Sequence, residues 1–198
     1  VASGYSHKTV NAGSVSKKDI QNDYLKKCLE FVDVEVIQKM RVVVNGMFGP
    51  VVKNVEALKL PIELIKLNAE PDGSFPKGAP DPLLPENRTE TVELIKSVKA
   101  DLGVAWDGDA DRVFFFDENG RFIPGYFVTA FLGAYFCKKN TGVKIIHDPR
   151  LTWAVSDVVK ATGGIPLINK VGHSFIKERM RNENAIFGGE LSGHYYFK

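Results

Sequence analysis

The sequence predicts an α/β protein made of two consecutive α/β domains, each with a mixed, largely parallel sheet flanked by helices. Short runs of β-branched and apolar residues alternate along the chain with segments whose apolar residues recur every three or four positions. The 198 residues suffice for two domains of about 100 residues each. A hairpin signal falls near residue 121 and the alternation restarts after it, so we place the domains at residues 1–121 and 122–198.

The first domain is expected to begin with an amphipathic helix and a β-α-β unit. Apolar residues at three- and four-residue intervals predict a helix over residues 17–38, with Ser16 as its N-cap. The β-branched run at residues 41–46 ends in Asn-Gly and predicts a strand. Helical spacing at residues 51–60 and a second strand at 62–67 complete the unit.

A long proline-rich segment then interrupts the pattern. Residues 69–88 hold five of the ten prolines and show neither helical nor strand spacing. A loop of this length inside a compact domain usually has a functional or interface-covering role. The elements expected after it are a helix capped by Thr89, a buried strand over residues 101–106, a strand over 113–116, and the second arm of a hairpin over 121–124.

The second domain is expected to repeat the alternation of helices and strands. The predicted helices cover residues 126–138, 152–161 and 174–181, and the predicted strands cover 143–147, 165–169 and 185–189. Each strand in this series is followed by a loop with polar residues. In open α/β sheets such loops carry the ligand-binding groups.

Composition argues against several classes of protein. The 26 lysine and arginine residues are scattered and balanced by 24 acidic residues, which disfavours a nucleic-acid partner. Cys28 and Cys137 lie far apart, so we expect neither a disulfide framework nor a thiolate zinc site, in keeping with a cytoplasmic protein. The longest apolar runs fall short of the roughly 18 residues of a membrane span, and residues 1–15 do not resemble a signal peptide.

The strongest chemical signal is a loop of three aspartates directly after the predicted strand at residues 101–106. Asp107, Asp109 and Asp111 lie within five residues and repel one another, with each close pair costing on the order of a few kcal/mol at an effective dielectric of about 20. Mg²⁺ prefers oxygen ligands and offsets this repulsion. A solvated acidic turn is the alternative. A calcium EF-hand is discounted because Arg112 occupies the position where that loop needs glycine.

Four further groups of polar residues follow predicted structure elements. Arg112 can pair with the neighbouring carboxylates or bind phosphate, and the sequence leaves both roles open. Gly172 and His173 open a helix and can face an anion there, although a lone histidine at such a place is more often a capping or packing residue. Glu190, Ser192 and His194 alternate along a loop and can bind sugar hydroxyls, whereas a Ser-His nucleophile lacks its usual surroundings. The fourth group is His147-Asp148-Pro149-Arg150. We expect these loops and the aspartates to converge on one cleft.

These residues resemble the α-D-phosphohexomutase family, in particular its bacterial phosphomannomutase/phosphoglucomutase branch. The resemblance runs from about residue 20 to the end of the chain. It rests on four segments in order: Asp107-Gly108-Asp109-Ala110-Asp111-Arg112, His147-Asp148-Pro149-Arg150-Leu151-Thr152-Trp153, Lys170-Val171-Gly172-His173, and Gly189-Glu190-Leu191-Ser192-Gly193-His194. Members of the family interconvert hexose 1-phosphate and hexose 6-phosphate through a bisphosphorylated sugar, using a phosphoserine and Mg²⁺.

The resemblance implies a role for each candidate site residue. The three aspartates are expected to hold the Mg²⁺, with Arg112 beside the phosphate as a catalytic group. Glu190 and Ser192 are expected to bind sugar hydroxyls, and His194 to bind substrate and carry a proton. The remaining substrate-binding residues implied are Arg150, Gly172 and His173.

Two parts of the family pattern are missing, and we therefore expect a fragment. The phosphoserine loop, a Ser-His-Asn-Pro type segment, has no match, because Ser6-His7 is followed by Lys8-Thr9. The C-terminal phosphate-binding domain is also absent. We expect the second and most of the third domain of a cytoplasmic phosphomannomutase or phosphoglucomutase, with its flanking domains as partners and no activity alone. The alternatives are a non-catalytic metal or sugar-phosphate binding module and, more weakly, an unrelated Mg²⁺-dependent phosphatase.

Overall fold

The computed structural model describes residues 13–198, so Ser6-His7 and most of the segment 1–15 lie outside the described residues. Residues Val34–Lys198 form one compact unit, and the described residues before them belong to a separate one. That separate unit contains α1 (Gln21–Leu29), which is shorter than the predicted helix and has no buried residue. Most helices in proteins depend on packing for their stability, and α1 has no buried face to extend it.

The predicted N-cap of the first helix is wrong. Ile20 precedes the first helical residue and makes no side-chain cap, whereas Oδ1 of Asp19 accepts a hydrogen bond from the backbone N–H of Gln21 at 3.0 Å. The apolar residues beyond Leu29 form a short 3₁₀ turn, Val34–Val36, instead of continuing the helix.

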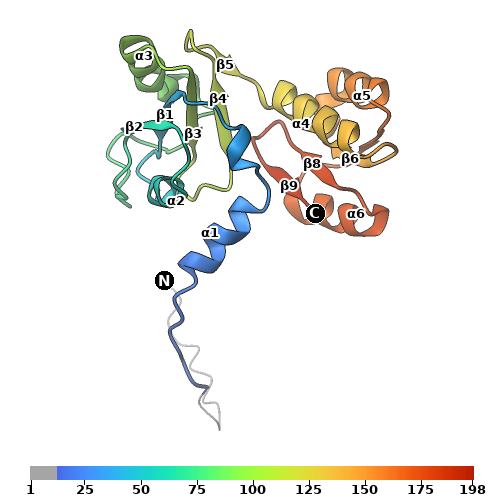
Figure 1. Ribbon diagram of the computed structural model, residues 1–198, viewed down its shortest axis with the longest axis horizontal. Coiled ribbons are helices and arrows are strands. Elements are labelled where there is room, and N and C mark those ends of the chain that lie inside the picture. The colour runs from blue at the N-terminus through green and yellow to red at the C-terminus, as the bar shows by residue number, and fades with distance from the viewer. Residues whose placement is uncertain (1–12) are drawn as a thin grey trace. The chain divides into compact units, whose positions relative to one another are not determined.

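The first sheet of the larger unit has five strands in the order β2-β1-β3-β4-β5 (Figure 1). The strands are β1 (Arg41–Asn45), β2 (Glu63–Leu67), β3 (Leu102–Trp106), β4 (Val113–Phe116) and β5 (Phe122–Ile123). β1 pairs in parallel with β2 and β3. β4 pairs antiparallel with β5, as the hairpin signal predicted, and it also pairs antiparallel with β3, which the sequence analysis did not predict. The loop between β3 and β4 carries the three aspartates.

Two helices cover opposite faces of this sheet because side chains alternate along β1. Val43 packs on the side of α3 (Thr89–Val98) with Ile95. Val42 and Val44 face the other way, toward Val52 of α2 (Val51–Ala57). Thr89 is the first residue of α3 and not its cap, because a 3₁₀ turn, Pro85–Arg88, leads directly into the helix.

The proline-rich loop is irregular up to the 3₁₀ turn Pro85–Arg88, and side chains of that turn hold it in place. Nδ2 of Asn87 donates to the carbonyl oxygens of Ala79 and Asp81, at 2.7 and 2.9 Å. The guanidinium of Arg88 donates from Nε to the carbonyl of Pro82 at 2.7 Å. This loop therefore has a defined conformation next to the carboxyl end of β3, where Pro80 accepts a hydrogen bond from the N–H of Gly108 at 3.2 Å.

The second sheet has four strands in the order β7-β6-β8-β9. The elements are α4 (Gly125–Lys139), β6 (Lys144–His147), a 3₁₀ turn (Pro149–Leu151), α5 (Thr152–Ala161), β7 (Ile165–Ile168), α6 (His173–Glu183), β8 (Phe187–Gly189) and β9 (Tyr195–Phe197). β6 pairs in parallel with β7 and β8, and β9 is antiparallel to β8. The sequence pattern predicted every one of these helices and strands except β9.

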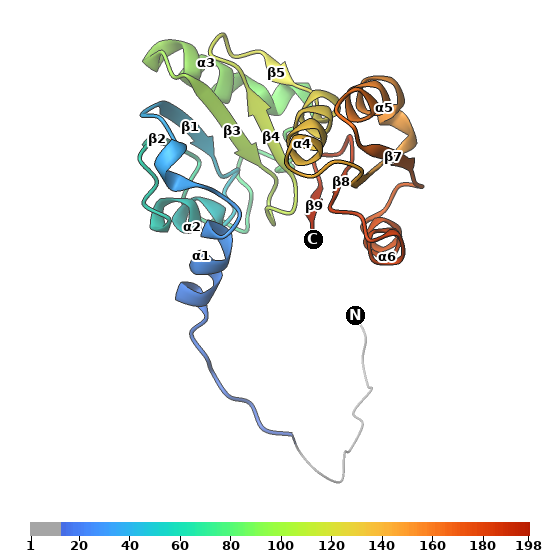
Figure 2. The same ribbon diagram turned by 45° about the vertical axis from the view of Figure 1, so that its right-hand side comes forward.

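Alternation along β6 again divides the core between the two faces of the sheet. Ile145 packs with Val155 and Cys137 under α4 and α5, and Ile146 packs with Ile176 of α6 on the opposite face (Figure 2). Cys137 is 1% exposed, whereas Cys28 on α1 is only partly buried.

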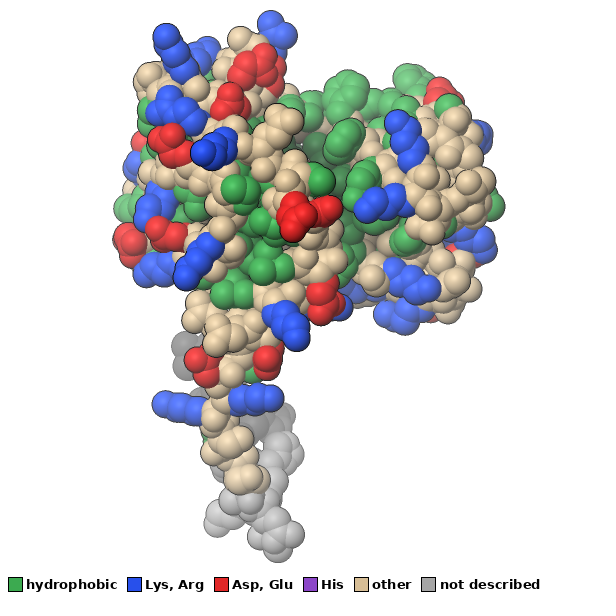
Figure 3. Space-filling model, in the orientation of Figure 1, with side chains coloured by type: hydrophobic (Ala, Val, Ile, Leu, Met, Phe, Trp, Pro, Cys, Tyr) green, Lys and Arg blue, Asp and Glu red, His purple; other side chains and the backbone are tan. Residues whose placement is uncertain are grey.

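The outer face of α4 is apolar and exposed. Phe127, Phe131 and Tyr135 recur every fourth residue there, and Figure 3 shows hydrophobic side chains gathered over this helix. Lysine and arginine side chains on the face drawn are scattered among acidic and neutral ones. Within residues 13–198, every helix is too short or too polar to cross a membrane.

Candidate functional site

The loop between β3 and β4 brings three carboxylates together. Oxygen atoms of Asp107, Asp109 and Asp111 all lie within 4.8 Å of one another, with Asp107 buried and the other two exposed. Ala110 has a left-handed backbone (φ 62°), and its N–H bonds to the carbonyl of Asp107 at 3.1 Å, which closes a tight turn. A small side chain suits this turn because bulkier residues rarely adopt such a conformation.

Asp107 combines burial with a strong cationic partner. Burial raises the pKa of its carboxyl, and hydrogen bonds from Arg112 only partly offset this effect. Three oxygen-donor side chains in this arrangement have the chemistry that hard divalent cations prefer. The residues present therefore fit a Mg²⁺ ion.

Arg112 is held by two carboxylates on different nitrogens. Its Nε donates to Oδ2 of Asp107 at 2.6 Å, and its Nη1 donates to Oδ2 of Asp81 at 3.1 Å. Burial disfavours the charged guanidinium, but Asp107 and Asp81 outweigh it, so the pKa of Arg112 lies above its ordinary value. The carboxylate-pairing role that the sequence left open is therefore observed, with one partner, Asp81, that sequence reasoning missed.

The loop after β8 is organised around the buried side chain of Glu190. Oε1 accepts the N–H of Gly172 at 2.9 Å, and Oε2 accepts the hydroxyl of Tyr196 at 2.6 Å. Burial and the neighbouring Glu190 raise the pKa of Tyr196, which keeps its hydroxyl protonated as a donor. The predicted residues Gly172 and Glu190 are thus in direct contact, and Tyr196 is a further member of the site that the sequence did not indicate.

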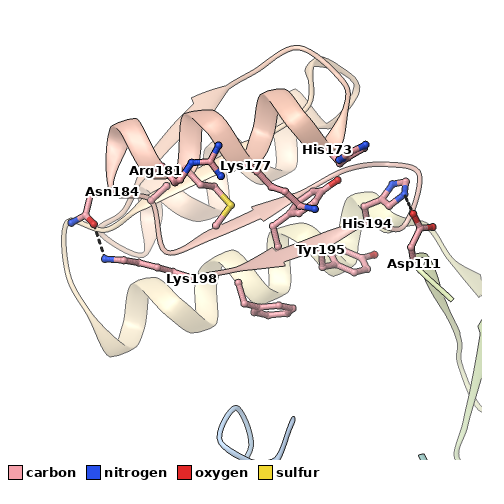
Figure 4. A pocket seen from close by; sticks show the side chains of 12 residues that line it. Asp111, His173, Lys177, Arg181, Asn184, His194, Tyr195 and Lys198 are labelled. Atoms are coloured by element: carbon pink, nitrogen blue, oxygen red, sulfur yellow. Dashed lines mark hydrogen bonds and ion pairs between the residues drawn. The ribbon is translucent and has the colours of Figure 1, made fainter. Parts of the chain in front are cut away.

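His194 links the loop after β8 to the aspartate loop. Its Nδ1 lies 2.8 Å from Oγ of Ser192, and its Nε2 lies 3.2 Å from Oδ2 of Asp111 (Figure 4). Nδ1 also lies 3.4 Å from Oε2 of Glu190. The backbone N–H of Val113 also donates to the carbonyl of Gly193, at 3.1 Å, and this bond holds the two loops close together.

A hollow of about 830 Å³ opens where these loops meet. Asp111, His173 and His194 line one end of it, and Figure 4 shows Lys177 and Arg181 of α6 along its length. The convergence expected from strand ends is therefore present only in part. Asp111, His173 and His194 line this hollow, whereas Asp107, Asp109 and Arg112 line a separate hollow of about 460 Å³. The side chains of Glu190 and Ser192 line neither of the two. Lys177, Arg181 and Lys198 give the larger hollow positive charge, which suits an anionic group.

The fourth predicted loop, His147-Asp148-Pro149-Arg150, holds a neighbouring loop in place. The carboxylate of Asp148 is fully buried and accepts hydrogen bonds from Nε and Nη2 of Arg150, at 3.2 and 2.7 Å, and from the N–H of Leu191 at 2.9 Å. The lining of the hollow does not include Arg150. Burial lowers the pKa of the neighbouring His147, whose Nδ1 lies 3.1 Å from the carbonyl of Asp148. Asp148 thus fixes the loop that carries Glu190.

Comparison with known proteins agrees with this architecture. Residues 22–120 match the family described as phosphoglucomutase/phosphomannomutase, alpha/beta/alpha domain II, and residues 124–198 match domain III of the same family. The chain is 47% identical over 193 residues to proteins named phosphomannomutase from Vibrio cholerae and Escherichia coli K12, covering 94% of this chain and 42% of each relative.

One solved structure has the same fold and a related sequence. The crystal structure of a phosphoglucomutase/phosphomannomutase family protein from Burkholderia thailandensis superposes with a TM-score of 0.89 at 31% identity, over 94% of this chain and 41% of that one. The chain therefore spans less than half the length of the relatives it matches, and it belongs to the phosphoglucomutase/phosphomannomutase family.

Proposed function

We propose that this chain supplies the metal-binding and sugar-binding portions of a phosphohexomutase of the phosphomannomutase type, which interconverts hexose 1-phosphate and hexose 6-phosphate. The observation that carries the proposal is the contact of His194 with Asp111, because it joins the loop of the carboxylate triad to the loop proposed to bind sugar hydroxyls. The relatives named phosphomannomutase support mannose as the sugar, with a phosphoglucomutase as the alternative.

The carboxylates of Asp107, Asp109 and Asp111 would hold Mg²⁺. When bound, the ion supplies Lewis-acid polarisation of a phosphoryl oxygen. Arg112 contributes positive charge beside that phosphate, where its guanidinium can bind two oxygens at once. Its anchoring by Asp107 fixes the position of this charge.

The loop after β8 would orient the sugar. The hydroxyl of Ser192 can donate a hydrogen bond to a sugar hydroxyl or accept one from it, and the carboxylate of Glu190 can only accept one, through lone pairs that Gly172 and Tyr196 do not use. The bond from Tyr196 and the contact of Ser192 with His194 hold these side chains in place before substrate binds. His194 is the candidate for moving a proton to or from the reacting hydroxyl, since an imidazole nitrogen can accept or donate a proton.

Three further residues are proposed to bind substrate. His173 lines the hollow and Gly172 supports Glu190 through its N–H. Nε and Nη2 of Arg150 bind Asp148 in this structure. A substrate phosphate would therefore be contacted mainly by Nη1.

The complete catalyst is proposed to need segments beyond these residues. We infer two domains here, with a boundary near residue 121, in a cytoplasmic protein whose other domains provide the phosphoserine and bind the distal phosphate. The 42% coverage of the named relatives supports this arrangement. The 198-residue chain is accordingly expected to turn over no hexose phosphate by itself.

The experiment is to express the protein from its whole natural reading frame and assay conversion of mannose 1-phosphate and glucose 1-phosphate with Mg²⁺. We expect turnover that requires the ion and falls about a hundredfold or more in Asp109→Ala. Absence of turnover with both sugars, or full activity of Asp109→Ala, would contradict the proposal. Binding of Mg²⁺ and hexose phosphate without turnover would instead indicate a non-catalytic binding module.

A further inference from the structure

We propose that Asp81, in the proline-rich loop, is a positioning residue that orients the guanidinium of Arg112 toward the phosphate expected beside the aspartate loop. Asp81 has this role only if the proposed function holds, because Arg112 is the side chain assigned to that phosphate. The role also gives a purpose to part of the proline-rich segment 69–88.

The contacts of Arg112 show why a second carboxylate matters. Asp107 engages only Nε of the side chain, at 2.6 Å, and a single point of contact leaves the guanidinium plane free to turn. The bond from Nη1 to Asp81, at 3.1 Å, is the second point and fixes the plane. Nη2 takes part in neither bond. A planar guanidinium held in this way presents its remaining N–H groups in a defined direction for an oxyanion.

Asp81 is itself rigidly placed. Its Oδ1 accepts the N–H of Leu83 at 2.9 Å, which leaves Oδ2 for Arg112. Its carbonyl oxygen accepts from Asn87 at 2.9 Å, and Arg88 holds the carbonyl of the next residue, Pro82. Groups that position a reacting side chain are effective only when they are fixed in this way.

The same loop borders the aspartates. A hollow of about 460 Å³ is lined by polar side chains of both loops, namely Asp81, Asp107, Asp109 and Arg112. Arg112 is the cationic side chain in that lining. A phosphate that approaches here together with a divalent ion meets the guanidinium in the orientation that Asp81 sets.

The test separates orientation of Arg112 from folding of the loop. Asp81→Ser keeps a side-chain oxygen for the N–H of Leu83 but is too short to reach Arg112. Asp81→Asn keeps an oxygen acceptor of the original length. The matched control is Asp72→Ser, because Asp72 lies in the same loop and accepts the N–H of Ser74 at 2.9 Å, as Asp81 accepts that of Leu83.

The first readout needs neither substrate nor metal. In ¹⁵N spectra of the protein, we expect separate Nη resonances for Arg112 in the wild type, because its bond to Asp81 slows rotation of the guanidinium. The two resonances should merge in Asp81→Ser and stay separate in Asp81→Asn and in the Asp72→Ser control. Identical Arg112 resonances in the wild type and Asp81→Ser overturn the inference.

The second readout is the kinetics of the protein from its whole reading frame. Asp81→Ser should lower kcat about tenfold with KM within about threefold, since a transition-state contact is lost. Asp81→Asn should recover most of kcat, and Asp72→Ser should match the wild type. Equal losses in Asp81→Ser and Asp72→Ser overturn the positioning role. A wild type without turnover contradicts the proposed function and with it the catalytic purpose of Asp81. The resonances of Arg112 report separately whether Asp81 orients the guanidinium, so the two failures are distinguishable.

Discussion

The carboxylate of Asp148 joins two loops that are 43 residues apart in the sequence, because its Oδ2 accepts the N–H of Leu191 at 2.9 Å while the same side chain binds Arg150. The loop after β6 therefore supports the loop that carries Glu190. The site depends in this way on groups that do not line the hollow, and several of the following predictions concern such groups.

Removal of one aspartate should weaken ion binding by the chain itself. Asp109→Ala deletes an exposed carboxylate of the triad without touching the core, and we expect at least about a tenfold loss of Mn²⁺ affinity, measured by electron paramagnetic resonance of the free ion. Glu118→Gln is the control, because it removes an exposed carboxylate in the β4–β5 turn. Equal affinities for all three proteins would argue against the aspartate loop as the ion site.

Replacement of Tyr196 should cost stability, and replacement of its neighbour should not. Tyr196→Phe removes a buried donor to Glu190, and we expect a loss of about 1–3 kcal/mol in the free energy of unfolding by urea. Tyr195→Phe is the matched control, since the buried hydroxyl of Tyr195 has no hydrogen-bond partner among the described residues. Removal of an unpaired buried hydroxyl should be neutral or slightly stabilising. The prediction fails if the two variants are destabilised equally.

Gly49 should tolerate no larger side chain. A Cβ at this position would lie 2.5 Å from the carbonyl oxygen of Gly108, so Gly49→Ala must displace the aspartate loop. We expect a lower thermal unfolding midpoint together with weaker Mn²⁺ binding. Gly73→Ala serves as the control, because a Cβ there meets nothing within 4 Å. A Gly49→Ala protein with the midpoint and affinity of the wild type would contradict the packing described.

Asp148 should make the protein sensitive to acid. Burial opposes its ionisation, but hydrogen bonds from Arg150 and Leu191 outweigh burial and hold the pKa of Asp148 below its ordinary value of 3.8. Its carboxylate therefore contributes stability that is fully present above pH 3.8 and is lost as the pH falls through the lower, folded pKa. The difference in unfolding free energy between the wild type and Asp148→Asn should accordingly narrow as urea titrations move from pH 7 toward pH 3. A constant difference would contradict the assignment.

His147 should add to this acid sensitivity at a higher pH. Burial lowers the pKa of its imidazole, so the unfolded chain binds a proton that the folded protein does not. Stability should therefore decline as the pH falls below the ordinary histidine pKa of 6.5, and His147→Gln should remove this part of the decline. Urea unfolding between pH 7.5 and pH 5 measures it, and identical pH profiles for the two proteins would contradict the prediction.

Local sequence pattern predicted the elements of this fold where a packed face repeats regularly. α5 begins and ends at the predicted residues because its apolar spacing faces Val155 and Val159 into the core. The helix over residues 17–38 was predicted too long because spacing alone does not reveal that α1 buries no residue. β9 was missed because its three consecutive aromatic residues, Tyr195–Phe197, show no alternation of polar and apolar side chains.

The site could be predicted where its chemistry is clustered in sequence. The three aspartates, and the group formed by Glu190, Ser192 and His194, stand within a few residues of one another. Asp81 lies 31 residues from Arg112, and nothing in local spacing joins the two. The only hint in the sequence was the length of the proline-rich segment, because a loop this long inside a compact domain usually has a function. Its length did not indicate that Asp81 is the residue that contacts Arg112.

The unequal burial of the two thiols should allow one of them to be labelled selectively. Burial raises the pKa of Cys137 and leaves it 1% exposed, whereas Cys28 on α1 is only partly covered. A maleimide dye at neutral pH should therefore attach at Cys28 in preference, without any engineered cysteine. A fluorophore placed there reports on the segment before Val34 while the sheets that carry the candidate site stay chemically untouched.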